Sequence, residues 1–360
     1  MKLDRRQFLL TGLAGTALAA QTRDAAPLLD RGFAQVTQIA PGVLVTIADG
    51  SKGQECISNG GVIAGRDAVL IVEGHMQPAG AALEIEVARM VSKAAIRGAI
   101  DTHFHIDHTF GNLGYAEQGI PILAHEKVAP FMKEQYAALK GVDKAPLLAP
   151  LEKKIAQAAD ATDRKHKEGD LAAWKWMYGA IDSTTLAFPT EPLATAQLPK
   201  RIDLGGLTAV IEFHPGHTVT DLIIRVLEHD VVFAGDLLFH RSYPVAIDAD
   251  MIAWRKVLDR FAGYSPKTRF VPGHGPACGL ETVRDQIDLF DDLRAHAEKM
   301  LRSGATAEEA ERRYMVPERF RNYRLAYWGL TVGAAMQSYF TKLGPASAAG
   351  AQLGRRSRRA

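Results

Sequence analysis

The chain has 360 residues, of which 47% are hydrophobic and 23% are charged, and its formal net charge is +2. This length can bury a substantial core in one large domain or two medium ones. The positive charge sits at the two ends, so the body between them is mildly acidic, which argues against nucleic acid as a partner.

The first 20 residues have the layout of an export signal. Arg5 and Arg6 precede an apolar stretch, and Ala17, Leu18 and Ala19 offer small residues for cleavage. We expect a twin-arginine-type signal peptide over 1–20 and therefore a periplasmic protein. An amphipathic helix or a membrane anchor fits less well, because the apolar stretch is short for a bilayer span. No other segment is predicted to cross a membrane.

After an irregular linker at 22–31, the first half of the body alternates strands with helices. Gly, Pro and Asp bound the strands, whereas the helices carry apolar residues along one side. The predicted strands are 43–47, 61–64, 68–72, 98–100 and 120–124, and the predicted helices are 78–95 and 126–138.

Residues 141–178 differ from their surroundings. They are rich in Ala, Lys, Glu and Asp, with aromatic residues near their end. We interpret them as part of a helical insertion, about 126–180, that covers one side of the site. The alternative is a solvated helical hairpin whose aromatic side chains pack on the body.

The second half repeats the order of strands followed by helices. Its predicted strands are 201–204, 208–213, 222–226, 231–234 and 269–271, and its predicted helices are 251–261, 280–301 and 317–342. This order predicts an α+β fold, a four-layer αββα sandwich over 33–303. A C-terminal helical extension over 304–343 and a disordered tail over 344–360 would follow it.

A metal-binding run directly follows the predicted strand 98–100. It contains His103, His105, Asp107 and His108, and alternation at a strand end lets the first two point the same way. Imidazole and carboxylate are suitable ligands for zinc. A histidine-rich surface loop is the alternative, but the position after an apolar strand favours metal.

Partners for this run occur at the ends of later strands. His217 follows the strand 208–213, Asp236 closes the strand 231–234, and His274 follows the strand 269–271. Each alone would be an ordinary turn residue. Together they complete a ligand set.

With these motifs, the chain resembles the metallo-β-lactamase superfamily over about 33–301. The resemblance implies two Zn2+ ions per chain and a bridging hydroxide as nucleophile. It implies that His103, His105 and His217 bind one zinc, that Asp107, His108 and His274 bind the other, and that Asp236 binds both. It also implies catalytic roles for Asp107, which would orient the hydroxide or shuttle a proton, and for Asp236.

Two positions refine the resemblance. Where the family usually has a supporting Asp, this chain has Glu73. At 236, β-lactamases of the superfamily generally carry Cys or Ser, whereas the glyoxalase II-like and lactonase branches carry Asp. Asp236 therefore moves the chain away from lactamases proper. Residues 235–245 look most like exported members associated with quinoprotein or sulfur-oxidation systems.

Several further residues are candidates for the site or its surroundings. His240, Arg241 and Tyr243 follow the bridging Asp and could line the substrate side, or form a structural loop. His75 could support the site or lie on the surface. Cys56 and Cys278 could pair in an oxidising periplasm, but two free, buried cysteines are the commoner outcome.

The expected function is zinc-dependent hydrolysis of an ester, thioester, lactone or amide in the periplasm. The alternatives are a β-lactamase, an iron-dependent redox enzyme of the same fold, and a quinoprotein-associated accessory protein. The expected partner is a small-molecule substrate, with no nucleic acid and no membrane beyond the cleaved signal. Oligomeric state is left open.

Overall fold

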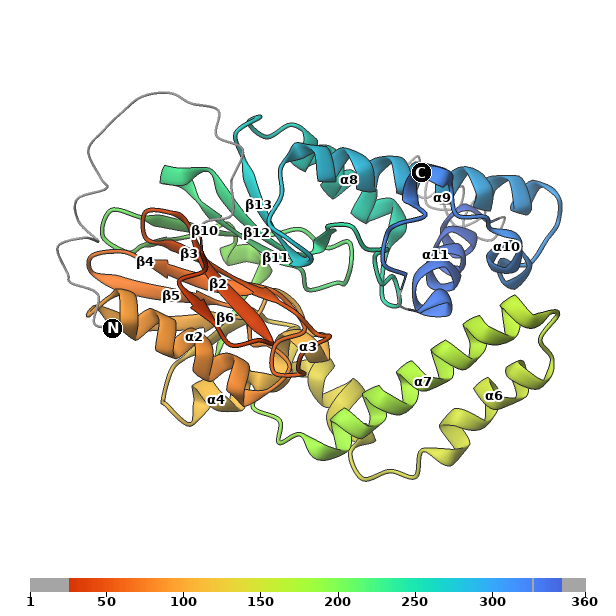
Figure 1. Ribbon diagram of the computed structural model, residues 1–360, viewed down its shortest axis with the longest axis horizontal. Helices are drawn as coiled ribbons and strands as arrows, with labels where there is room; N and C mark the ends of the chain where they lie inside the picture. Colours follow the sequence, from red (N-terminus) through yellow and green to blue (C-terminus); the bar gives the residue numbers. More distant parts are fainter. Residues whose placement is uncertain (1–25, 326, 345–360) are drawn as a thin grey trace, which may run out of the picture.

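Two sheets lie face to face in the computed structural model, with helices on both outer sides (Figure 1). The structure describes residues 26–325 and 327–344. This arrangement confirms the predicted αββα sandwich.

The sheets contain eight and five strands. The first has the order β1 (Leu29–Asp30), β2 (Ala34–Ala40), β3 (Val43–Ala48), β4 (Gly60–Ala64), β5 (Ala68–Val72), β6 (Ala95–Ile100), β7 (Ile122–His125) and β8 (Glu191–Leu193). The second has the order β13 (Arg269–His274), β12 (Val231–Phe239), β11 (Leu222–Val226), β10 (Thr208–Phe213) and β9 (Lys200–Asp203).

The helices divide between the two outer faces, the insertion and the C-terminal region. The longer ones are α2 (Pro78–Val91), α6 (Ala145–Ala156), α7 (Ala161–Ser183), α8 (Met251–Ala262), α9 (Leu280–Arg302) and α11 (Ala334–Leu343). The shorter ones are α3 (Ile106–Thr109), α4 (Leu113–Ala116), α5 (Val128–Phe131) and α10 (Ala307–Arg313). The 3-10 and π-helical turns are η1 (Phe110–Asn112), η2 (Met132–Tyr136), η3 (Ala137–Leu139), η4 (Thr195–Gln197), η5 (Leu227–His229), η6 (Glu318–Phe320) and η7 (Gly329–Gly333).

Among the described residues, the apolar side chains form four clusters, of which three join the layers of the sandwich and the fourth, with Phe104, Phe110 and Tyr136, lies at the base of the insertion. Side chains such as Val45, Ile211 and Phe233 fill the space between the sheets. A second layer joins the first sheet to α2, and a third joins the second sheet to α8, α9 and the C-terminal helices. The C-terminal extension therefore shares the core of the sandwich.

Strand direction determines where the site forms. β6 runs parallel to β5 and β7, and β12 runs parallel to β13. Parallel strands end at the same edge of a sheet, so the residues that follow them are brought together.

The insertion reaches the C-terminal region. In Figure 1, the α6–α7 hairpin extends below the sandwich and approaches α10 and α11. Both carboxylate oxygens of Asp170 on α7 accept a hydrogen bond from the Gly329 N–H, at 2.9 and 3.0 Å. The rings of His166 and Trp328 stack with centroids 4.2 Å apart.

Several predicted element boundaries were wrong. The supposed linker 22–31 ends in β1, which pairs with β2, and neither strand was predicted. β8 was also missed, and β12 continues to Phe239 rather than ending at 234. The helix predicted over 126–138 is broken into α5, η2 and η3. In the helix predicted over 317–342, the short turn η6 comes first, and the continuous helical part begins only at Gly329.

The cysteines and the helices test two further expectations. Cys56 and Cys278 are free and buried, as favoured, because they lie in different apolar layers on opposite sides of the sandwich. No helix among the described residues is long and apolar enough to cross a membrane. The predicted signal over 1–20 and almost all of the predicted tail lie outside the described residues.

Candidate metal centre

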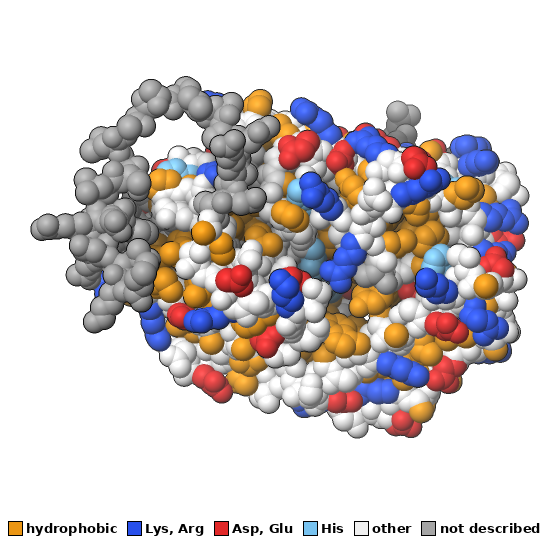
Figure 2. All heavy atoms as spheres, in the orientation of Figure 1, with side chains coloured by type: hydrophobic (Ala, Val, Ile, Leu, Met, Phe, Trp, Pro, Cys, Tyr) orange, Lys and Arg blue, Asp and Glu red, His pale blue; other side chains and the backbone are white. Residues whose placement is uncertain are grey.

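All seven predicted ligands meet at one edge of the sandwich. They form two groups, one of His103, His105, His217 and Asp236 and another of Asp107, His108 and His274, in each of which one ligand atom per residue lies within 4.8 Å of the others. Figure 2 shows a hollow near the middle of the face drawn, with a histidine side chain and basic side chains beside it.

Three imidazole nitrogens converge in the first group. His105 Nδ1 lies 3.1 Å from His103 Nε2 and 3.0 Å from His217 Nε2. Ligand atoms around a tetrahedral zinc ion, bound at about 2.0–2.1 Å, are separated by roughly 3.3 Å. The spacing therefore fits a single metal ion.

The hydrogen bonds of the outer ring nitrogens fix two tautomers in this group. Asp248 Oδ2 lies 2.9 Å from His105 Nε2, so this nitrogen carries the proton. The Thr102 hydroxyl donates to Glu73 at 2.8 Å, and its oxygen, 3.0 Å from His103 Nδ1, is left to accept from that nitrogen.

Consequently, lone pairs of His103 Nε2 and His105 Nδ1 face each other at 3.1 Å. Two lone pairs repel at this distance unless a cation lies between them. With both rings neutral, these two nitrogens thus fit a metal ion and form no hydrogen bond with each other.

The second group combines a carboxylate with two imidazoles. Asp107 Oδ2 lies 3.2 Å from His274 Nε2 and 3.4 Å from His108 Nε2. His108 Nε2 is nevertheless a buried atom without a hydrogen bond in the described structure. The contacts are close but poorly directed, as expected for atoms arranged around an ion.

Asp236 joins the two groups. Its Oδ1 lies 3.2 Å from His108 Nε2 and 3.4 Å from His274 Nε2, whereas its Oδ2 lies 3.4 Å from His217 Nε2. A Cβ atom at position 273 would lie 1.8 Å from Asp236 Oδ1, so only glycine leaves room for this carboxylate. Each oxygen of Asp236 can thus serve a different ion.

Before an ion binds, the protonation states suit metal binding at the first group. Burial lowers the pKa of His217 to about 3 and that of His103 well below its usual range, so both rings are neutral, as ligands must be. In the second group, burial is outweighed by the charges of Asp236 and Asp107, which raise the pKa of His274 to about 10 and that of His108 well above its usual range, so these two rings would bind an ion with loss of a proton. Burial opposes ionisation of Asp107 and Asp236, but the imidazoles of His108 and His274 hold the pKa of both carboxyls well below the usual range. Both carboxylates are therefore ionised.

Glu73 supports the second group, as its position predicted. Its Oε2 lies 2.9 Å from His108 Nδ1, and its Oε1 accepts from the Thr102 N–H at 3.2 Å. Glu73 adopts φ +90° and His75 adopts φ +58°, conformations that are costly for residues other than glycine. The tight loop 73–75 is what directs the Glu73 carboxylate at His108.

Asp248 was missed by the sequence interpretation. It lies in the loop between β12 and α8, beyond every recognised motif. Its bond to His105 depends on how that loop crosses the site, and no local pattern signals this. A short run of Asp residues, Asp248 and Asp250, was the only available hint.

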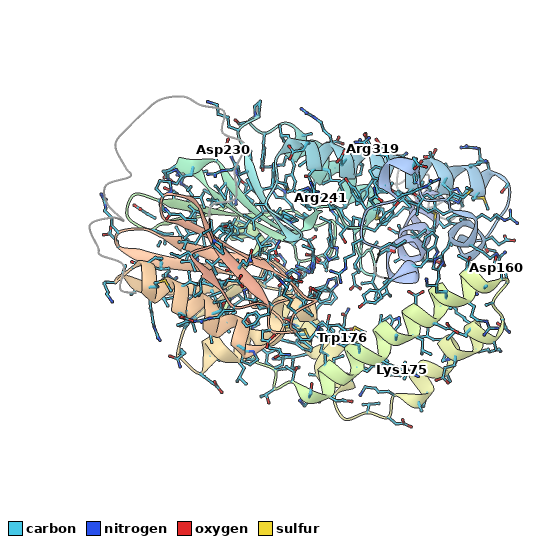
Figure 3. All side chains as sticks on the ribbon, in the orientation of Figure 1. Asp160, Lys175, Trp176, Asp230, Arg241 and Arg319 are labelled. Atoms are coloured by element: carbon cyan, nitrogen blue, oxygen red, sulfur yellow. The ribbon has the colours of Figure 1, made fainter. Side chains whose placement is uncertain are left out.

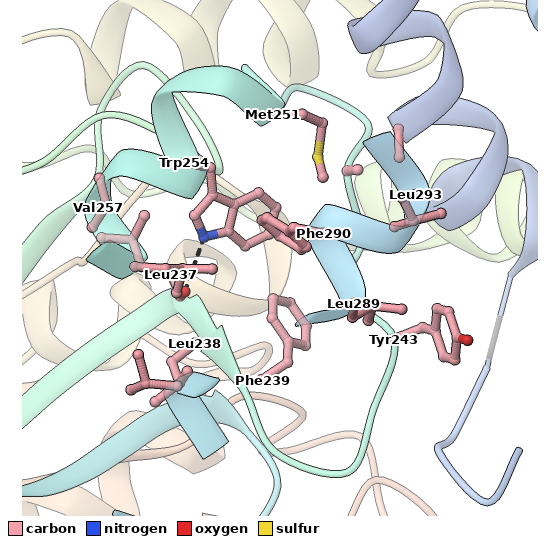
Figure 4. Packing of buried hydrophobic residues seen from close by; sticks show 14 of the residues in the cluster. Leu237, Leu238, Phe239, Tyr243, Met251, Trp254, Val257, Leu289, Phe290 and Leu293 are labelled. Atoms are coloured by element: carbon pink, nitrogen blue, oxygen red, sulfur yellow. Dashed lines mark hydrogen bonds between the residues drawn. The ribbon is translucent and has the colours of Figure 1, made fainter. Parts of the chain in front are cut away.

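A buried tryptophan stands behind His217. The Trp254 ring lies 5.0 Å from the His217 ring, and its indole N–H donates to the Leu237 carbonyl at 2.9 Å (Figure 4). Asp221 accepts hydrogen bonds from Gly216 N and Thr218 N, which pins the loop that carries His217. The third histidine of the first group is therefore rigidly held.

The residues predicted to face a substrate differ in their placement. Tyr243 is 3% exposed and packs in the core with α9 (Figure 4), because the turn at Arg241, φ +57°, sends the chain back inward. That placement corrects the expectation for Tyr243. Arg241 is exposed (Figure 3) and has no side-chain partner among the described residues, and the His240 ring lies 3.0 Å from the Pro276 carbonyl.

His75 is neither a ligand nor a surface residue. It is completely buried, with Nε2 3.0 Å from Glu84 Oε1 and Nδ1 3.2 Å from the Ser58 carbonyl. Its bonds hold the end of the strained loop that presents Glu73.

Comparison with known proteins finds a match to the family described as the Metallo-beta-lactamase superfamily over residues 53–274. Uncharacterized proteins of Mycobacterium tuberculosis and Mycobacterium bovis are 34% identical over 109 residues, which is 27% of this chain and 49% of theirs. The chain thus matches about half the length of these curated relatives.

Two solved structures share the fold at low sequence identity. A metallo-beta-lactamase from Pontibacter korlensis is 17% identical, with a TM-score of 0.51 over 72% of this chain and 99% of its own. The stereoselective inverting sec-alkylsulfatase Pisa1 from Pseudomonas sp. is 15% identical, with a TM-score of 0.57 over 88% of this chain and 51% of its own.

Proposed function

The chain belongs to the metallo-beta-lactamase superfamily, and on that premise we propose that it is a periplasmic hydrolase that uses two zinc ions to cleave an ester, thioester, lactone or amide. The observation that carries the proposal is the convergence of unprotonated nitrogens in the first group, joined through Asp236 to a second group. This donor set supports two cations, one at each group, rather than one.

Each group of side chains would bind one ion. His103, His105 and His217 would hold one ion, Asp107, His108 and His274 the other, and Asp236 both. Bound there, the ions would polarise the bond under attack and supply a nucleophile from water at neutral pH. Asp107, ionised and 18% exposed at its side chain, would orient that water or shuttle its proton.

Substrate binding would fall to the loop after β12 and to the insertion. The exposed guanidinium of Arg241 has no side-chain partner among the described residues and can accept a substrate carboxylate. The half-buried His240 lies beside it.

A β-lactamase is the second candidate, and Asp236 disfavours it because a carboxylate occupies the position that lactamases of the superfamily give to Cys or Ser. An iron-dependent redox enzyme and an accessory protein without catalysis are the remaining alternatives. Metal analysis separates them from the hydrolase.

The periplasmic location rests on residues 1–20 alone. A fusion of this segment to a reporter that folds before export tests it. Export that stops when Arg5 and Arg6 are both replaced by Lys supports a twin-arginine signal, and export that continues contradicts it.

The proposed chemistry is tested by a substrate panel on zinc-loaded protein. The panel holds thioesters, aryl esters, lactones and a chromogenic cephalosporin, and a secondary alkyl sulfate because the likeness to the sulfatase extends over 88% of this chain. His103→Ala should abolish turnover, whereas His229→Ala, the same change in η5, should not. Turnover that survives in His103→Ala would contradict the proposal.

A further inference from the structure

Tyr136 lies near the candidate metal centre, where the charges of Asp248 and Asp107 act on it. Tyr136 is 6% exposed, yet its hydroxyl makes no hydrogen bond to the described residues. The hydroxyl oxygen is not fully buried, so solvent reaches it. A buried ring thus presents a solvent-accessible donor that the protein itself leaves unused.

The ring of Tyr136 is held by the residues that flank the ligands. It packs edge-on against Phe110 at 5.3 Å, just beyond His108. Five residues earlier, at the end of α5, Phe131 stacks on Phe104 with ring centroids 4.9 Å apart, and Phe104 lies between the candidate ligands His103 and His105. Figure 1 shows this segment beside α3, which carries Asp107 and His108.

The local backbone is unusual. Tyr136 ends η2, a five-residue π-helical turn at the base of the insertion. π-helical turns are rare in proteins, but those that occur are often found at functional sites, where the extra residue redirects the side chains that follow. Here the turn brings a tyrosine from the insertion to the run of ligands.

The charges of two carboxylates act on this hydroxyl. Burial raises the pKa of Tyr136 well above its usual range, and the charges of Asp248 and Asp107 raise it further. Asp248 holds the first group through His105, and Asp107 belongs to the second. The phenol therefore stays protonated and can only donate at neutral pH.

We propose that the Tyr136 hydroxyl donates a hydrogen bond to the substrate oxygen on which negative charge develops during hydrolysis. The inference rests on the proposed function and adds to it a catalytic residue supplied by the insertion. Its preferred substrates carry an oxygen, in a carbonyl, an ester or a tetrahedral oxyanion, close to both ions. No proton is transferred in this role.

Kinetics of Tyr136→Phe test the role. Removal of an oxyanion donor lowers kcat on the order of 10²-fold, whereas KM should change far less, because the bond strengthens as charge develops. Tyr178→Phe removes a hydroxyl from the same apolar cluster, on α7, and should keep full turnover. An equal loss in both variants would mean a loosened insertion and would overturn the proposal.

Binding of methylphosphonate, a tetrahedral oxyanion, gives a readout that needs no turnover. Calorimetry on zinc-loaded protein should show weaker binding to Tyr136→Phe and unchanged binding to Tyr178→Phe, at equal zinc content. Hydrolysis with undiminished kcat and affinity in Tyr136→Phe would refute the inference and leave the hydrolase intact. Phosphonate binding that depends on Tyr136 without any turnover would refute the hydrolase and the catalytic role of Tyr136, and would show that its hydroxyl only binds an oxyanion.

Discussion

Asp248 Oδ2 lies 2.9 Å from His105 Nε2, on a ring whose other nitrogen faces His103 and His217. The carboxylate thereby sets both the tautomer and the orientation of a ligand. It connects the loop after β12 to the run after β6, two segments more than 140 residues apart in the sequence.

Removal of this carboxylate should weaken the first metal position. Asp248→Ala should lower zinc affinity by about 10- to 100-fold, and Asp248→Asn by less, because the amide oxygen still accepts the His105 proton. Competition with a chromogenic chelator measures the affinities. Asp250→Asn, in the same loop, preserves a helix cap and should bind zinc like the wild type. Equal affinity in Asp248→Ala and the wild type would show that the contact is incidental.

Glu73 should play the corresponding part at the second position. Glu73→Gln removes the charge that His108 Nδ1 faces at 2.9 Å, and zinc per chain should fall from about two toward one under mild chelation. Glu212→Gln is the matched control, because Glu212 is also buried and lies 2.9 Å from the ring of His214, which is not one of the seven candidate ligands. Zinc loss of the same size in both variants would point to general unfolding instead.

The candidate ligands were predictable from the sequence because each lies within or just after an apolar stretch, and such stretches are visible by the Gly, Pro or Asp that bounds them. β10 and β12 both run antiparallel to β11 and so point the same way, and β13 runs parallel to β12, so His217, Asp236 and His274 reach one edge of the second sheet. Asp248 and Tyr136 were not predictable, since a long loop and an irregular helical turn bring them in. Both depend on tertiary contacts that no local pattern encodes.

Similar reasoning explains the incorrect predictions. Tyr243 follows Asp236 closely in the sequence, but the αL turn at Arg241 redirects it into the core. β1 has only two residues, too few for a recognisable pattern. The aromatic residues of the insertion differ in their packing. Tyr178 packs on the body, as the hairpin alternative predicted, whereas Trp176 is 40% exposed.

Trp254 should support the fold as well as His217. Trp254→Ala removes a fully buried indole and its hydrogen bond to Leu237, which typically costs about 3–5 kcal/mol. Trp176→Ala, at a 40% exposed position of α7, should cost far less. Urea denaturation of zinc-free proteins measures both changes. Midpoints lowered equally would contradict the packing described here.

The contact between the insertion and the C-terminal region should depend on pH. Burial raises the pKa of Asp170 to about 6, against the Gly329 N–H and the charge of Lys154, which lower it. Burial and the charge of Asp170 raise the pKa of Glu311, on α10, to about 7. Detached, both groups would titrate near 4, so the closed contact binds protons that the open one releases.

The contact should therefore be strongest below about pH 4 and weaken progressively as pH rises through 6 and 7. Hydrogen exchange of the Gly329 amide, expressed as a protection factor, should decrease over this range. Asp170→Asn keeps an acceptor without a charge and should show a smaller decrease. Protection that is constant or rises with pH in the wild type would refute the assignment.

Metal content tests the central claim most directly. Elemental analysis of purified protein should find two zinc ions per chain, and Asp236→Ala should hold markedly less at both positions, because each carboxylate oxygen faces a different group. One iron per chain in the wild type, or full zinc content in Asp236→Ala, would contradict a two-zinc centre joined by Asp236.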